Sequence, residues 1–278
     1  MERVTKQLFG TLMCLVLLVA TVVGCNNKPD SGKDLLAKVY KKMAKVSSFS
    51  MHSKLLMDTT MSGVTSLVSV DNELGVVLEP FELTMKQEYK DGEKESVTNY
   101  MYTKPDKKME TFLYNNGQWN KTEISSKQIQ DFKEKYSSPV DFCLYFNEVD
   151  SFTITSSDDE AIVLEGTVSE SNMVNVLKET GALKQLSLTS FPEDKLGNSK
   201  PIIIKAWVDP SSMCFTKVSV DMTQTYQDLT NLLFGEDSLV SPKINQCMVE
   251  LSNIVINKPQ DITMPADIQA SLDKLLQG

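Results

Sequence analysis

The sequence is poor in histidine, with a single residue of this type, His52, among 278. Catalytic zinc is usually bound by histidine, and a serine-hydrolase triad usually uses histidine as its base. A single histidine therefore argues against both kinds of site. A glycine-rich phosphate-binding loop is also missing from the sequence. The carboxylate run Asp158-Asp159-Glu160 lies in a polar turn, whereas a glycosidase needs two carboxylates held in a cleft. We therefore expect no enzyme, no cofactor and no metal site, and a hydrolase is the least supported function.

Cysteine is scarce as well, and its positions predict no disulfide framework. Beyond the N-terminal segment described below, the cysteines are Cys143, Cys214 and Cys247. Their number is odd and their spacings match no zinc or redox motif. We expect Cys214 and Cys247 to stay unbonded, because antiparallel pairing of strands 213–222 and 248–256 would hold them several times farther apart than a disulfide allows.

The chain has fewer positive than negative charges, and this negative net charge disfavours anionic partners. The formal net charge is −9, and the acidic residues are dispersed along the chain rather than gathered in blocks. Nucleic acid and anionic membrane surfaces are therefore poor partners. Hydrophobic residues make up 41% of the chain and charged residues 23%, which is ordinary globular composition and enough for a sizeable core.

The longest hydrophobic run lies at the N-terminus and has the pattern of a secretory signal. Arg3 and Lys6 precede an uncharged apolar run from Leu8 to Val23. The run is shorter than the roughly 20 residues that a spanning helix needs. The residues that follow, 26–32, are polar and rich in turn formers rather than a stop-transfer pattern. A permanent transmembrane helix is the weaker interpretation.

The end of this run resembles the lipobox of bacterial lipoprotein precursors. The string Val22-Val23-Gly24-Cys25 places small residues before a thiol, which is the nucleophile that accepts a diacylglyceryl group. The resemblance implies a signal peptide over 1–24, a lipid on Cys25 that holds the protein at the extracytoplasmic face of the cell membrane, and a flexible tether over 25–33. The alternative is an ordinary secretory signal that happens to contain a cysteine.

The mature chain opens with a helix pattern and continues with alternating strands. Ser31 followed by Asp34 predicts a capped helix start, with an apolar stripe up to Val46. Strict alternation over 48–57 and again over 81–90 predicts half-buried strands, and Asp91-Gly92 predicts a hairpin into strand 95–103. A further hairpin joins 109–114 to 118–123 and gives Trp119 a cross-strand partner.

The second half predicts more strands with helices between them. We expect two short helices over 125–145 and a helix from Ser169 to Gly181. Strands are expected over 151–156, 161–168, 201–208, 213–222 and 248–256. The segment 226–246 is an insertion that is partly helical, and a short amphipathic helix ends near Leu276.

This ordered series resembles a known family. A lipobox, a helix running directly into a strand, meandering hairpins through Tyr89, Tyr102 and Trp119, and the closing Ile262-Thr263-Met264-Pro265 are similar to uncharacterised lipoproteins of Gram-positive bacteria with the LolA/LppX-like (LppX/LprG-like) fold. The resemblance implies an α+β fold in one domain over 34–278. That fold is a strongly curved antiparallel sheet, an unclosed half-barrel, with helices packed on its concave face over an apolar cavity.

The resemblance further implies binding or carriage of a lipid-like or other hydrophobic ligand by a monomer. Methionine, of which the chain has 14, is adaptable enough to line such a site. The candidate ligand-binding residues, expected to share one strand face, are Phe49, Met51, Leu55, Met57, Phe81, Leu83 and Met85. The same side chains could instead form an ordinary filled core, and the alternative function is a cell-envelope module that recognises another protein or a wall polymer without a ligand cavity.

Overall fold

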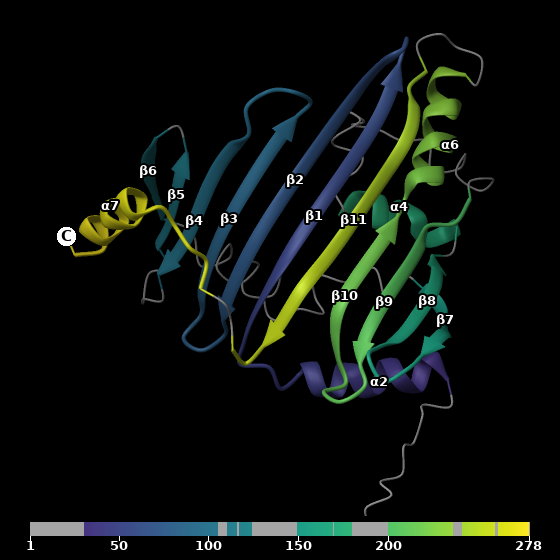
Figure 1. Ribbon diagram of the computed structural model, residues 1–278, viewed down its shortest axis with the longest axis horizontal. Helices are drawn as coiled ribbons and strands as arrows, with labels where there is room; N and C mark the ends of the chain where they lie inside the picture. Colours follow the sequence, from purple (N-terminus) through teal and green to yellow (C-terminus); the bar gives the residue numbers. More distant parts are fainter. Residues whose placement is uncertain are drawn as a thin grey trace, which may run out of the picture.

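The computed structural model describes residues 31–104, 110–115, 117–123, 149–168, 170–179, 200–235, 241–258 and 261–277. These residues contain both helices and strands (Figure 1). The helices are α2 (Gly32–Met43), α4 (Glu170–Glu179), α6 (Thr223–Phe234) and α7 (Ala266–Gln277). The strands are β1 (Ser48–Met61), β2 (Val64–Val77), β3 (Glu82–Asp91), β4 (Val97–Lys104), β5 (Glu110–Asn115), β6 (Gln118–Glu123), β7 (Val149–Ser157), β8 (Ile162–Val168), β9 (Ile203–Asp209), β10 (Cys214–Asp221) and β11 (Lys243–Ile256).

All eleven strands form one open, antiparallel, curved sheet, which confirms the predicted fold class. The order is β6-β5-β4-β3-β2-β1-β11-β10-β9-β8-β7. Two meanders, β1 to β6 and β7 to β11, therefore meet at a central pair formed by the first and the last strand. That pair runs from Phe49 opposite Ile256 to Thr60 opposite Lys243. Tight turns permit the meanders, as at Gly63 and Gly92, whose backbones have positive φ.

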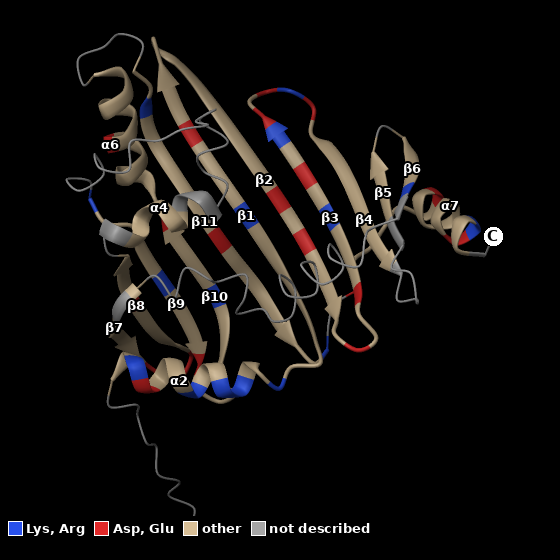
Figure 2. Ribbon diagram, turned by 180° about the vertical axis from the view of Figure 1, so that it is seen from behind, with Lys and Arg blue, Asp and Glu red and all other residues tan. Residues whose placement is uncertain are grey.

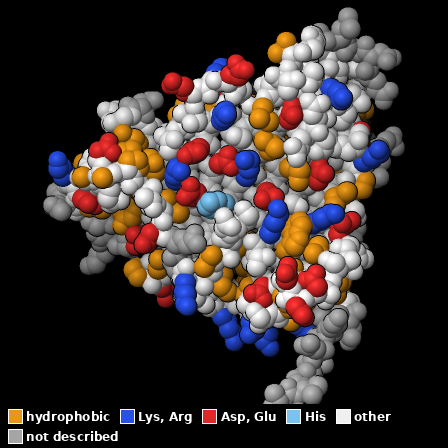
Figure 3. Space-filling model, in the orientation of Figure 1, with side chains coloured by type: hydrophobic (Ala, Val, Ile, Leu, Met, Phe, Trp, Pro, Cys, Tyr) orange, Lys and Arg blue, Asp and Glu red, His pale blue; other side chains and the backbone are white. Residues whose placement is uncertain are grey.

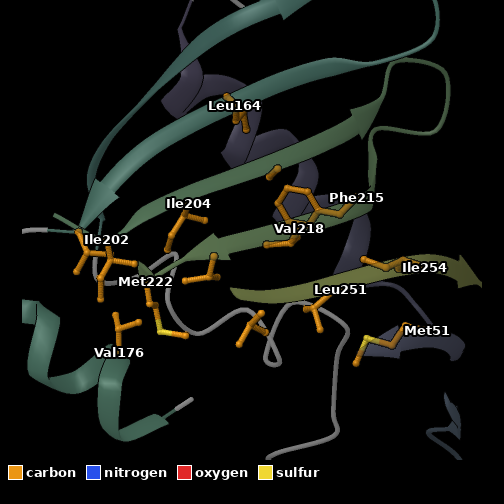
Figure 4. Packing of buried hydrophobic residues seen from close by; sticks show 14 of the residues in the cluster. Met51, Leu164, Val176, Ile202, Ile204, Phe215, Val218, Met222, Leu251 and Ile254 are labelled. Atoms are coloured by element: carbon orange, nitrogen blue, oxygen red, sulfur yellow. The ribbon is translucent and has the colours of Figure 1, made fainter. Parts of the chain in front are cut away.

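The main hydrophobic core lies on one side of this sheet, which we call the inner face. Alternating side chains of β1 to β3 and β8 to β11 point to it, and Figure 4 shows Ile204, Val218 and Leu251 doing so, with Val176 of α4 on the same side. The view from behind in Figure 2 has α2 and α4 in front of the sheet. The helix residues in this core are Leu35, Val39, Met43, Met173, Val174, Val176, Tyr226 and Leu229.

Helix α7 lies on the opposite side of the sheet, the outer face, which corrects the prediction that the helices share the concave face. It covers β4 to β6, where aromatic side chains take the outward positions of the alternation. The members of this second cluster are Tyr100, Tyr102, Phe112, Tyr114, Trp119, Met264, Ile268, Leu272 and Leu276. The sequence predicted that the terminal helix is amphipathic but not which part of the sheet it covers. Its apolar side packs against the aromatic side chains at the outward positions of β4 to β6.

The rest of the outer face is polar and carries ion pairs between neighbouring strands (Figure 3). Lys86 on β3 lies 3.0 Å from Glu73 on β2 and 2.9 Å from Glu88 on its own strand, and Lys217 lies 2.6 Å from Glu250 on the neighbouring strand. His52 is exposed among these charges, as its place in the alternation predicts. Such exposed pairs contribute little stability each, so this face is a solvated surface.

Helix α6 replaces a strand beside β11, which corrects the description of 226–246 as a single insertion. Helix α6 already begins at Thr223, and β11 already begins at Lys243. Because β10 ends at Asp221, the first part of β11 has no strand on that side, and α6 supplies its hydrogen bonds instead. Gln227 Oε1 accepts from the Ile244 amide at 2.8 Å, and Thr223 Oγ1 accepts from the Cys247 amide at 3.0 Å.

Several further predictions can be checked against these elements. The Ser31 side chain accepts from the Asp34 amide at 3.1 Å, so the capped start of α2 is confirmed. Trp119 pairs with Tyr114, and Cys214 and Cys247 are free, lying on antiparallel strands, as expected. Strand β2 was missed altogether. The signal and tether up to residue 30 and the helices over 125–145 lie outside the described residues.

Candidate functional site

The seven residues predicted to bind a ligand lie together on the inner face. In the strand register, Phe49 and Leu83 both pair with Val76, and Met51 and Met85 both pair with Leu74. The remaining three, Leu55, Met57 and Phe81, belong to the same core cluster. The shared face is thus confirmed, and its use for ligand binding remains a prediction.

This face changes from buried to exposed along β3 and β4. On β3, Leu83 is fully buried, Met85 is half-buried, and Tyr89 is 39% exposed. On the neighbouring strand, Met101 is buried, whereas Val97, which pairs with Tyr89, is 50% exposed. The gradient leads toward the β3–β4 hairpin, at the end of the sheet away from α2 (Figure 1). Apolar side chains are therefore reachable from solvent at that end.

A row of uncharged polar side chains crosses the inner face between the apolar rows, and we call it the amide row. It consists of Ser53, Asn72, Gln87 and Asn99, each opposite the next on β1, β2, β3 and β4. All four are half-buried. The prediction of strict apolar alternation over 48–57 and 81–90 is therefore wrong at Ser53 and Gln87.

The amide row lies between two apolar rows. On the buried side are Met51, Leu74, Met85 and Met101, and on the exposed side are Leu55, Val70, Tyr89 and Val97. Gln87 donates from Nε2 to Asn72 Oδ1 at 2.9 Å. The sequence analysis missed this row, although a signal existed: Ser53 and Gln87 each occupy an inward position in an otherwise apolar alternation.

The charged groups near the amide row are either paired with other charges or lie on the outer face. Asp91, at the end of β3, pairs with Lys94 across the hairpin turn. Hydrogen bonds from the Lys86 ammonium to Glu88 and Glu73 raise the pKa of Lys86, but this group lies on the outer face. Burial raises the pKa of Cys247 to about 12, so this thiol stays protonated and unreactive near neutral pH. Within the described ranges, no three His, Cys, Asp or Glu side chains gather as a metal site would require.

Two buried hydroxyl groups on the core side lack hydrogen-bond partners in the part of the chain that the structure describes. They are Thr103 Oγ1 on β4 and Tyr226 Oη on α6. An unsatisfied buried hydroxyl is costly. The two lie on β4 and beside β11, so they do not form one site.

Comparisons with known proteins provide no functional information about this chain. No protein-family profile and no curated protein matches the chain. Among solved structures, a DUF1329 family protein from Desulfovibrio piger aligns over 81% of this chain and 92% of that chain, with 9% sequence identity and a TM-score of 0.25. Among the described helices, none has the length and apolar character needed to cross a membrane.

Proposed function

We propose that this protein is a lipoprotein anchored through Cys25 at the extracytoplasmic face of the cell membrane, where it binds or carries a lipid-like or other hydrophobic ligand. The observation that carries the proposal is the gradient along the inner face, from the buried Leu83 to the exposed Tyr89 and Val97. In an ordinary core, apolar side chains are shielded from solvent. Here, apolar side chains of the inner face are exposed near the β3–β4 hairpin. Binding, rather than catalysis, is the role that such a surface supports.

The proposed anchor is consistent with the direction of this gradient. Only six residues lie between Cys25 and Gly32, the first residue of α2, so these seven residue steps can span at most about 25 Å. The α2 end of the sheet would therefore lie close to the membrane. The exposed end of the inner face, near the β3–β4 hairpin, would then face away from the membrane and toward incoming or departing ligand.

The test is uptake of a ligand by residues 26–278. Native mass spectrometry after gentle purification should show a bound lipid-sized mass, and a fluorescent fatty acid should bind. Met85→Ala and Leu55→Ala should weaken uptake while costing less than the roughly 2 to 5 kcal/mol of unfolding free energy expected from truncation in a filled core. Thr84→Ala is the matched control, because Thr84 is adjacent to Met85 on the outer face.

Two results together would contradict the proposal. One is a wild-type protein that neither carries nor takes up any lipid. The other is a full core-sized loss of stability at both Met85 and Leu55, which would show that these side chains only fill the interior.

A second candidate, an envelope interaction module, is favoured by an exposed apolar end of the molecule. Met61 and Val64, at the tip of the β1–β2 hairpin, are exposed, as are Leu232 and Phe234 at the end of α6. Both segments lie at the same end of the sheet (Figure 1). If this end binds a partner, a photo-crosslinking residue at Val64 should capture one defined protein in cells, and the same residue at His52, on the outer face, should not.

A further inference from the structure

We propose that the amide row selects ligands that carry an uncharged hydrogen-bonding group, such as the hydroxyl and ester groups of a diacylglycerol, over ligands with an anionic head. This inference rests on the proposed function and specifies the chemistry of its ligand. It concerns the four side chains Ser53, Asn72, Gln87 and Asn99, which cross the inner face between two apolar rows.

The amide row is confined to the part of the sheet where the inner face becomes exposed. Across the central strand pair, Ser53 is opposite Leu251, which pairs in turn with Val218, and Val218 pairs with Ala206. The same level of the sheet is therefore apolar on β9 to β11 and polar on β1 to β4. Core packing alone favours apolar side chains at every inward position, so the change of polarity points to a different requirement on β1 to β4.

The amide row has hydrogen-bonding capacity to spare. A primary amide offers two N–H donors and an oxygen with two lone pairs. The bond from Gln87 to Asn72 uses one donor and one acceptor. In the described part of the chain, no hydrogen bond of the Asn99 or Ser53 side chain competes for their groups. All four side chains are half-buried rather than buried, so each residue keeps part of its surface open to solvent.

The charges around the amide row disfavour an anion. Neither flanking row contains a charged side chain, and the nearest inward charge toward the hairpin is the carboxylate of Asp91. Lys94, the cation beside it, is already paired with that carboxylate. Within the described residues of β1 to β4, a phosphate or carboxylate group placed at the amide row would lose water and find no cation on either flanking row. A hydroxyl or ester loses much less, because amide groups replace its hydrogen bonds to water.

The apolar part of such a ligand can lie on the apolar rows that flank the amide row. Successive inward side chains of a strand are about 7 Å apart along it. A polar group at Gln87 therefore lies one step from Met85 and one step from Tyr89. A hydrocarbon chain can lie against the half-buried thioether side chain of Met85, which adapts to a flexible chain more readily than a branched residue does.

The experiment compares three probes that each carry a pyrene-labelled hydrocarbon chain and that differ in their polar part. They are a pyrene-labelled diacylglycerol, the corresponding phosphatidic acid and a pyrene-labelled alkane. Each is titrated into wild-type residues 26–278 and into the double variant Gln87→Met/Asn99→Leu, which keeps side-chain size and makes the row apolar. The matched control is Thr98→Val, which removes a polar group from the adjacent outward position of β4.

We expect the wild type to bind the diacylglycerol more tightly than the other two probes. In the double variant, the affinity for diacylglycerol relative to the alkane should fall about tenfold, as expected for the loss of one to two hydrogen bonds. Thr98→Val should leave this ratio unchanged. Circular dichroism and thermal unfolding should show that both variants fold, since the double variant places apolar side chains beside apolar rows and Thr98→Val keeps the shape of the side chain.

The inference is overturned if the wild type binds all three probes equally, if phosphatidic acid binds best, or if the double variant keeps the wild-type ratio. Each of these results leaves ligand binding itself intact. Failure of the wild type to bind any of the three probes would instead count against the proposed function.

Discussion

The indole N–H of Trp119 donates to Ser271 Oγ at 2.9 Å and so joins β6 to α7. The same N–H lies 3.2 Å from the carbonyl oxygen of Ile268. The indole ring also packs on Tyr114, with ring centroids 5.3 Å apart. One side chain thus contributes both apolar contact and a polar link to the attachment of the terminal helix.

Trp119→Ala should therefore release α7 from the outer face. We expect a loss of roughly 2 to 4 kcal/mol in the unfolding free energy of the α7 region, because truncation removes both the ring contact and the hydrogen bond. Hydrogen exchange should become fast in α7 and stay slow in α2 on the inner side. Trp119→Phe, the control that keeps a ring, should have a smaller effect, and equal exchange in α7 for all three proteins would contradict the assignment.

Gly32→Ala should shift or loosen the start of α2. A Cβ atom at this position would lie 2.1 Å from the carbonyl oxygen of Phe152 in β7, so helix and strand could not keep their present distance. We expect a loss of roughly 1 to 3 kcal/mol by urea unfolding. Lys33→Ala, at the adjacent exposed position, is the control and should change stability by less than about 0.5 kcal/mol.

Stability should fall at alkaline pH through the Cys247 thiol. Burial, with a smaller effect of Asp221, raises the pKa of Cys247 from 9.0 to about 12. Above pH 9 the unfolded chain gives up this proton while the folded chain keeps it. The contribution is therefore fully present below pH 9 and is lost as the pH rises toward 12, by at most about 1.4 kcal/mol per pH unit.

Urea titrations at pH 7.5, 9 and 10.5 measure this dependence, and Cys247→Ala removes the thiol. The variant should be less stable at pH 7.5 because of the cavity, but its stability should fall less steeply above pH 9. Parallel curves for the two proteins would show that Cys247 does not titrate in this way.

Cys25→Ala should abolish lipid attachment. Metabolic labelling with a fatty-acid analogue should mark the wild-type protein and leave the variant unlabelled, because the thiol is the acceptor that the Val22-Val23-Gly24-Cys25 pattern predicts. Cys214→Ala, whose thiol is buried, serves as the control and should remain labelled. A labelled, membrane-bound Cys25→Ala protein would refute the anchor.

The sequence predicted those elements whose two faces differ clearly. Strand β1 has one clearly apolar face, and the β5–β6 hairpin has a strong turn sequence. Both elements were predicted. Strand β2 was missed because Asn72 interrupts its inward face, while Leu67 and Gly75 interrupt its outward one, so no single period stands out. Likewise, Lys243 to Gln246 are mostly polar and concealed the start of β11.

Placement of the elements was harder to predict than their type. Strand β4 is apolar on both sides, with Met101 inward and Tyr100 outward, and alternation cannot say which side receives a helix. The candidate site shows the same limit. The seven apolar residues were correctly predicted to share one face of the sheet. The amide row was not predicted, because it depends on the register of four strands.

The pairing of β1 with β11 has a consequence for how the protein is made. The central pair joins β1 to β11, so neither meander has its full set of neighbours until β11 has been synthesised and, under the proposed export, has crossed the membrane. An exported chain gains from this delay, because early folding would block its passage. A chain cut before Lys243 should stay protease-sensitive and aggregation-prone, with the long edge of β1 unpaired, and a protease-resistant product of that length would argue against this order of events.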